Sequence, residues 1–279
     1  MKLDGNQAWK QAVAWVSANR DVVIAIAGVF FLLPSLATGL FGPQPPTPAV
    51  GMTAPQLVAS AQQFYARALP FLTVMLLMQS AGILALLMLF TDARRPTVGI
   101  ALQRSLAGLL SYIAAQLLPA FAIFVLAALI FVVAGLLVTL LGGPATMSLV
   151  VLALAVSIVA AIYVLVRCSL SGPVIAVERT RNPIRALMRS WTLTGGNTGR
   201  LVVLFLLLFI LFVVVIMTVT AITGIVLSLA LSPANARIVA EIISSLLSTA
   251  ATVYLAAILA AVHRQLAGPM LSDHRATSE

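Results

Sequence analysis

The feature that most constrains this chain is a run of 62 consecutive residues, 105–166, that contains no Asp, Glu, Lys or Arg. A membrane-spanning helix needs about 20 predominantly apolar residues. The run is therefore long enough for two spans, and the Gly-Gly-Pro sequence at 142–144 predicts the break between them. We expect these two spans at 110–141 and 146–171.

Composition extends this interpretation to the whole chain. Of its 279 residues, 62% are hydrophobic and 8% are charged, whereas a soluble globular chain carries roughly 25% charged residues. No segment between the apolar blocks is long enough to bury a core of its own. Further spans are predicted at 21–41, 68–91, 201–231 and 238–263. The expected fold class is all-α: a single polytopic membrane domain, a bundle of six transmembrane helices with short cytoplasmic interfacial helices.

The Lys and Arg residues predict the orientation of the bundle, because cytoplasmic loops are enriched in them. One predicted side holds Lys2, Lys10, Arg20, Arg94, Arg95, Arg104, Arg167, Arg179, Arg181, Arg185, Arg189, Arg200, Arg264 and Arg275. The other side holds Arg67 and Arg237. This asymmetry predicts a multi-pass protein of the bacterial inner membrane with both termini in the cytoplasm. It also assigns the net charge of +9 to membrane topology and anionic lipid rather than to nucleic acid.

A polar stretch between two apolar blocks predicts a short helix over residues 182–194. Asn182 suits the N-cap, Pro183 the first helical position, and Gly195 and Gly196 the end of the helix. A helix of this length between two spans is expected to lie in the membrane interface.

The two faces of this predicted helix differ in chemistry. The apolar face carries Ile184, Leu187, Met188 and Trp191, and the other side carries Arg181, Arg185 and Arg189. Trp, Leu and Arg segregated in this way are typical of a helix that binds a lipid surface. The four residues Arg181, Arg185, Arg189 and Trp191 are therefore candidates for contact with anionic lipid or with a protein partner. The alternative is a linker whose charges serve only topology.

Residues 1–20 predict a second interfacial helix, with Trp9, Val13 and Val16 on one face. A signal peptide is the competing interpretation, but the segment lacks a clean small-x-small cleavage site. At the other end of the chain, the polar residues 264–279 predict a cytoplasmic tail.

The sequence offers no catalytic, cofactor-binding or metal-binding constellation. No two of its seven acidic residues are spaced as a catalytic pair, and His263 and His274 lack further ligands nearby. The single cysteine, Cys168, excludes an internal disulfide. Arg167 and Glu178 are placed to form an ion pair at headgroup level. We therefore expect a protein that is not an enzyme and holds no cofactor.

Two amides, Gln79 and Gln116, lie inside predicted spans, where an unpaired amide is costly. Gln79 is expected to find a partner on another helix, and the alternative is that these amides line a cavity. A row of small residues at four-residue spacing predicts a packing seam on the last span. It consists of Ser244, Ser248, Thr252, Ala256 and Ala260.

Part of the sequence resembles a known family. The segments are Gly172-Pro-Val-Ile-Ala-Val-Glu178, Ala186-Leu-Met-Arg-Ser-Trp-Thr-Leu-Thr194 and Gly196-Asn197, with Ala14-Trp15, Asn19 and Leu33-Pro34 near the start. They resemble the glycerophosphoryl diester phosphodiesterase membrane-domain family and the YciC-like six-span bacterial proteins. In members with phosphodiesterase activity, that activity lies in a separate cytoplasmic barrel domain, which these 279 residues do not contain. The resemblance implies a membrane module without catalytic residues.

The sequence leaves two leading functions open, and a membrane-embedded enzyme, which would need polar groups converging from several spans, ranks third. The first is a non-catalytic membrane module whose cytoplasmic face binds anionic lipid or a partner protein. The second is a transporter, channel or exporter component for a small or lipid-like solute.

Overall fold

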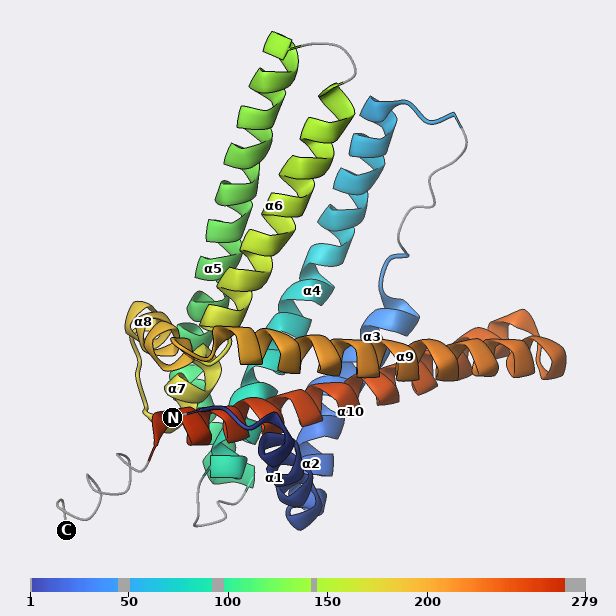
Figure 1. The fold of residues 1–279 in the computed structure, drawn as a ribbon. Coiled ribbons are helices and arrows are strands. Elements are labelled where there is room, and N and C mark those ends of the chain that lie inside the picture. Colours follow the sequence, from blue (N-terminus) through green and yellow to red (C-terminus); the bar gives the residue numbers. More distant parts are fainter. Residues whose placement is uncertain (1, 45–50, 92–97, 142–144, 269–279) are drawn as a thin grey trace. The chain divides into compact units, whose positions relative to one another are not determined.

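The structure is a computed structural model that describes residues 2–44, 51–91, 98–141 and 145–268. Within these ranges all regular secondary structure is helical. The elements are α1 (Gly5–Ala18), α2 (Arg20–Ala27), the π-helix η1 (Gly28–Leu32), α3 (Leu33–Phe41), α4 (Ala54–Thr91), α5 (Val98–Leu141), α6 (Ala145–Cys168), α7 (Ser171–Val177), α8 (Pro183–Thr194), α9 (Thr198–Ala230) and α10 (Pro233–Ala267) (Figure 1). The expected tail beyond Gly268 and the basic residues Arg94, Arg95 and Arg275 lie outside the described residues.

Six helical segments in the described ranges are long and apolar enough to cross a membrane. They are Arg20–Phe41, Pro55–Thr91, Leu106–Leu140, Met147–Val177, Thr198–Ala230 and Pro233–Ala267. Their outer surfaces carry many exposed large apolar side chains, as expected of helices whose solvent is lipid. The prediction of an all-α polytopic bundle is confirmed.

The chain is organised as two compact units, each assembled from segments that are distant in sequence. Unit 1 contains Met1–Ala12, Ala107–Leu208 and Ile258–Glu279. Unit 2 contains Val13–Leu106 and Phe209–Ala257.

The core of unit 2 forms where the π-helix η1 packs against the second half of α4. Phe30 and Phe31 of η1 are buried, and so are Leu84 and Leu87 of α4. The helices approach closely at Gly82, since a methyl group there would lie 2.6 Å from Phe30 Cβ and 2.7 Å from Phe31 Cζ. Glycine at this position lets two aromatic side chains of the first span lie directly against the second span.

This close approach predicts that Gly82→Ala destabilises the fold. Alanine ordinarily favours a helix, but here its methyl group would overlap Phe30 and Phe31. Overpacking of this kind lowers the free energy of unfolding by about 1–3 kcal/mol. The control is Gly224→Ala on α9, where the added methyl group meets no atom within 4 Å. Thermal unfolding in detergent should show a lower midpoint for Gly82→Ala and an equal or higher midpoint than wild type for the control, because alanine favours the helix where its methyl group has space. Equal midpoints for both variants would contradict this close packing of η1 on α4.

The seam predicted on the last span differs from the buried face in its first half, where Ser244 and Thr252 are only half-buried. Ala256 and Ala260 are buried as expected, but the residues buried earlier on α10 are Ser245, Thr249 and Val253. Ser248 is exposed. The buried face is therefore shifted by one position there, which places three different side chains against the rest of unit 2.

Candidate functional site

The candidate site lies in unit 1, where the chain turns back after α6 and forms the pair α7 and α8 (Figure 1). We call residues 167–197 the α7–α8 cap. Helix α7 is buried from Ser171 to Ala176. The chain then leaves it at Glu178 and passes Arg179, which adopts the left-handed conformation with φ of 54°. An extended residue, Asn182, precedes the next helix.

Helix α8 begins as the sequence predicts. The Asn182 side chain accepts hydrogen bonds from the backbone amides of Ile184 at 2.9 Å and Arg185 at 3.2 Å. These bonds satisfy two amides that have no partner within the helix, and Pro183 occupies the position where an amide is not needed. Arg181 precedes the helix, and its carbonyl accepts a hydrogen bond from the Ser111 hydroxyl of α5. It does not belong to the basic face of α8.

The buried residue Ser190 fastens α8 to the end of α6. Its hydroxyl donates to the Arg167 carbonyl at 2.8 Å and accepts from the Leu170 amide at 3.1 Å. One turn later, the buried Thr194 hydroxyl donates to the Ser190 carbonyl at 2.9 Å and lies 3.3 Å from the Arg167 carbonyl. The two hydroxyls thus supply hydrogen bonds to the Arg167 carbonyl at the C-terminus of α6, where carbonyls lack partners within the helix.

Helix α8 packs against α6 through a face of small residues, and its apolar side is therefore left uncovered. Ala186, Ser190 and Thr194 are buried at four-residue spacing, whereas Ile184 is 58% exposed and Met188 is 66% exposed. Trp191, on the same outward side, is 39% exposed. Leu187, which the sequence placed on the same side, is half-buried, and a third, small polar face holds the helix in place.

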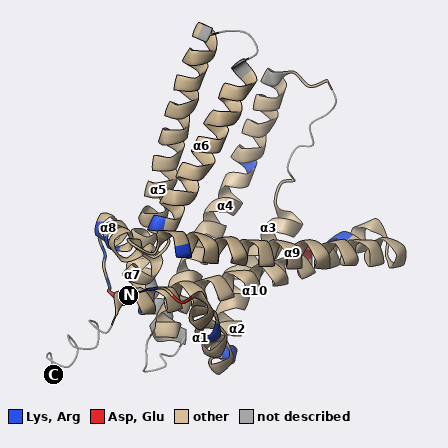
Figure 2. Ribbon diagram, in the orientation of Figure 1, with Lys and Arg blue, Asp and Glu red and all other residues tan. Residues whose placement is uncertain are grey.

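Arg167 links the apolar side of α8 to α6. Its guanidinium carbon lies 4.5 Å from the centre of the Trp191 ring and 6.0 Å from that of Tyr163, distances typical of cation–π contacts. The two rings meet edge to face, 5.8 Å apart. Arg167 Nη1 also lies 3.5 Å from the Thr198 hydroxyl, while its buried Nε has no hydrogen-bond partner among the described residues. Basic residues of the cap are marked in Figure 2.

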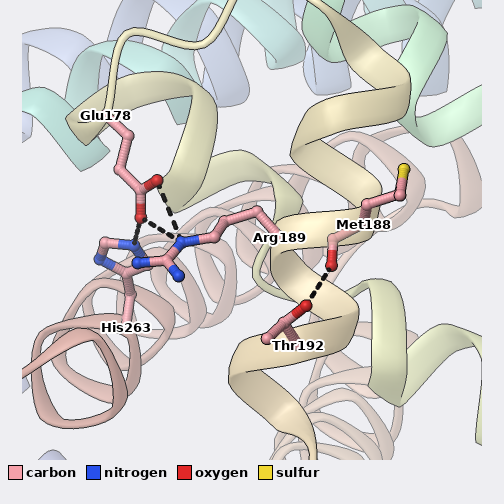
Figure 3. Close-up of polar contacts among 5 residues, drawn as sticks. All are labelled: Glu178, Met188, Arg189, Thr192 and His263. Atoms are coloured by element: carbon pink, nitrogen blue, oxygen red, sulfur yellow. Dashed lines mark hydrogen bonds and ion pairs between the residues drawn. The ribbon is translucent and has the colours of Figure 1, made fainter.

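The polar side of α8 is held by Glu178, which lies between Arg189 and His263 (Figure 3). Arg189 Nε lies 3.3 Å from both carboxylate oxygens. His263 Nε2, on α10, lies 3.2 Å from Oε1. An ionised carboxylate only accepts hydrogen bonds, so Nε2 carries the hydrogen in this contact. The ion pair expected between Arg167 and Glu178 is replaced by this three-residue cluster.

The protonation of Glu178 reflects these neighbours. Burial by itself raises the pKa of its carboxyl group, but the hydrogen bond with His263 and the positive charge of Arg189 outweigh burial. The pKa of Glu178 is therefore lowered from its ordinary value of 4.5. The carboxylate is charged at neutral pH and acts as a fixed anion between a helix of the cap and the end of α10.

The first residues of the chain also join the cap. Asn197 Oδ1 accepts from the Leu3 amide at 3.1 Å. Gln265 exchanges two hydrogen bonds with Asp4, accepting from its amide at 3.1 Å and donating to its carbonyl at 3.2 Å. Residues from positions 3 and 4, the cap and the end of α10 thus meet within unit 1.

The three arginines that the sequence placed on one side of the helix have different environments in the structure. Arg185 is exposed on α8, Arg189 is paired with Glu178, and Arg181 lies in the preceding turn. Sequence reasoning treated His263 only as a possible metal ligand and missed its contact with Glu178. No periodicity relates two residues 85 positions apart on different helices.

The two intramembrane amides belong to different units. Gln79 is half-buried on α4 in unit 2, and no partner on another helix is seen for it among the described residues. Gln116 is exposed in unit 1, and its amide donates to the Tyr112 hydroxyl, one turn earlier on α5, at 2.9 Å.

The described ranges contain no group of three or more His, Cys, Asp or Glu residues that could hold a metal ion. No protein-family model, curated protein or solved structure matches the chain. The fold and composition define an integral, multi-pass membrane protein of the all-α class.

The cluster around Glu178 predicts that Glu178→Gln weakens the fold. Arg189 and His263 both lose a charged acceptor, and hydrogen bonds to charged groups contribute about 1.5–3 kcal/mol each. Thermal unfolding in detergent at neutral pH should show the loss. The control is Asp21→Asn, which breaks an exposed surface pair and should change stability by less than about 1 kcal/mol.

The same cluster sets the pH dependence of stability. The folded protein lowers the pKa of Glu178, so the stabilisation is complete above the ordinary value of 4.5 and is lost as pH falls through the lower folded value. The stability difference between wild type and Glu178→Gln should therefore shrink in acid. A difference that stays constant across an acid titration would show that the carboxylate charge does not stabilise the cap.

Proposed function

We propose that the protein is a non-catalytic inner-membrane module whose α7–α8 cap binds anionic lipid at the cytoplasmic surface. The observation that carries this proposal is the uncovered apolar side of α8. Ile184 and Met188 are exposed although the helix is firmly held, and the basic side chain of Arg185 lies beside them on the same helix. Lipid is a partner that matches both an apolar strip and adjacent positive charge.

The Arg167–Trp191–Tyr163 group supports the same proposal. Trp and Tyr are enriched at membrane–water interfaces, and Arg extends its charge toward the headgroups. Both rings are partly exposed, and both contact the guanidinium. This arrangement would place the group at headgroup level, next to the exposed strip of α8. A protein partner that binds the same surface is the second possibility within this proposal.

The resemblance to the glycerophosphoryl diester phosphodiesterase membrane-domain family is consistent with such a module. The longest segments that carry the resemblance, 172–178, 186–194 and 196–197, lie within the cap, whereas the matching residues near the start of the chain do not. We propose that the chain acts without catalysing a reaction itself, as that resemblance implies.

The proposal requires the cap to face the cytoplasm. The distribution of Lys and Arg then predicts that both termini are cytoplasmic and that the segment around Gly51 is on the opposite side. Reporter domains fused after Gly51 and after Glu279 should therefore report opposite compartments. If both fusions report the same compartment, the six-span orientation is wrong.

Lipid contact can be measured on the full chain with Trp191 as its single tryptophan. Replacing Trp9 and Trp15 with Phe keeps aromatic side chains at both positions. In nanodiscs, brominated phosphatidylglycerol should quench Trp191 fluorescence more strongly than brominated phosphatidylcholine, because anionic lipid is enriched around the cap. High salt should reduce the difference, since surface charges are screened over about 10 Å at 0.1 M salt.

Arg185→Gln should weaken the preference for phosphatidylglycerol about fivefold, since each basic residue near a membrane surface contributes about 1 kcal/mol. The matched control is Arg67→Gln, which removes one exposed charge on the predicted opposite side. Equal quenching by the two lipids in the parent protein would exclude recognition of lipid charge by the cap. Equal losses in Arg185→Gln and Arg67→Gln would assign the preference to net charge instead of to α8.

A further inference from the structure

Unit 2 contains a row of polar side chains on α10 that the lipid-binding proposal does not use. Glu241, Ser245 and Thr249 recur at four-residue spacing and therefore lie on one face of the helix. Ser245 is 1% exposed. Its hydroxyl donates to Glu241 Oε1 at 3.4 Å and lies 3.1 Å from the Ser35 hydroxyl of α3. Three oxygen-bearing groups from two helices are thus in contact.

The backbone of α3 makes room for the carboxylate. Gly39 lies one turn after Ser35, and a methyl group at that position would overlap the Glu241 carboxyl group. Glycine leaves the space in which the carboxylate lies against the helix backbone here. The π-helix η1 ends just before this segment at Leu32. A π-helical turn contains an added residue, which rotates all later residues of the helix, including Ser35 and Gly39, by about 100°. Turns of this kind frequently occur at functional sites.

No basic side chain pairs directly with this carboxylate among the described residues. Elsewhere among these residues, Arg20 pairs with Asp21, and Glu178 pairs with Arg189 and His263. Arg237, one turn before Glu241, instead donates to the Gly39 carbonyl at 3.4 Å. The negative charge of Glu241 therefore has a hydroxyl as its close partner.

The group lies within an apolar span. The first span begins at Arg20, and Ser35 is 15 residues further on, or about 22 Å at 1.5 Å per residue. The hydrocarbon core of a bilayer is about 30 Å thick, so Ser35 and Ser245 lie inside it, with Glu241 one turn nearer the boundary. An ionisable residue in a span is costly without a compensating charge and generally marks an ion or substrate site.

A fourth oxygen is available one turn further along α10. The Thr249 hydroxyl oxygen is buried and has no hydrogen-bond partner among the described residues. Helical hydroxyls in this chain commonly donate to the carbonyl four residues earlier, as Thr252 does to Ser248 at 2.9 Å. Thr249 follows Ser245 by four residues and so lies on the same face of α10, and an unused buried hydroxyl there points to a ligand that would occupy it.

We propose that Glu241, Ser245, Ser35 and Thr249 form a binding site for a monovalent cation of the size of sodium. Hard cations take oxygen ligands, and around an ion with metal–oxygen distances of about 2.4 Å neighbouring oxygens lie about 3.4 Å apart. The observed separations of 3.1 and 3.4 Å match this spacing. One carboxylate balances one positive charge, whereas a divalent ion would require additional negative charge from its ligands. The site is independent of the α7–α8 cap.

The test uses the full chain in detergent. Thermal unfolding is measured in sodium, potassium and choline chloride at equal ionic strength, and binding of radioactive sodium is measured on the folded protein. Sodium should raise the midpoint relative to choline, because a ligand that binds only the folded state stabilises it. Glu241→Gln and Ser245→Ala should each weaken the apparent sodium affinity about tenfold or more.

The matched control is Ser248→Ala, which removes an exposed hydroxyl from a different face of α10 and should bind sodium as the wild type does. If Glu241→Gln does not fold, Ser35→Ala and Thr249→Val test the same site without changing charge. Equal midpoints in sodium and choline for the wild type would overturn the proposal. So would sodium binding that survives in all the site variants. Stabilisation by acid that is insensitive to sodium and absent in Glu241→Gln would identify a proton as the occupant and also overturn it.

Discussion

The cap depends on the two hydrogen bonds of one buried hydroxyl, that of Ser190. A membrane helix that ends inside protein leaves carbonyls without partners, and water is scarce there. Ser190 accepts from Leu170 and donates to Arg167, so it bridges the last turn of α6 and the turn after it. Because the residue is small, α8 can lie close to α6. That contact fixes which faces of α8 remain available, and the apolar strip is outward for this reason.

Several charged side chains around the cap hold its helices together. Glu178 connects α8 with α10 through Arg189 and His263, and Arg167 is engaged with Trp191. Burying a carboxylate is unfavourable unless it is paired and hydrogen-bonded. Here the pairing outweighs the burial, as the lowered pKa of Glu178 indicates. Of the basic residues that the sequence grouped on one helix face, Arg185 is the one on α8 that is left exposed.

Features set by local pattern could be predicted from the sequence, and features set by contacts between distant segments could not. The six spans derive from long apolar runs, and the start of α8 derives from Asn182 and Pro183, because these signals act within a few residues. The bond between His263 and Glu178 depends on how two helices pack, which no spacing encodes. The buried face of α10 was misplaced for a related reason. Both rows consist of small residues, and only the position of α3 decides that Ser245 rather than Ser244 faces inward.

The polar residues of the segment 186–197 are accounted for by folding contacts. Arg189 binds Glu178, Ser190 bonds α6, and Asn197 accepts from Leu3. These contacts set the shape of the cap, whatever the cap binds. The side chains free to meet a partner, Ile184 and Arg185, lie before the Arg-Ser-Trp sequence and take no part in these contacts. Evidence for function has to come from the exposed strip of α8, where substitutions would alter binding without altering the fold.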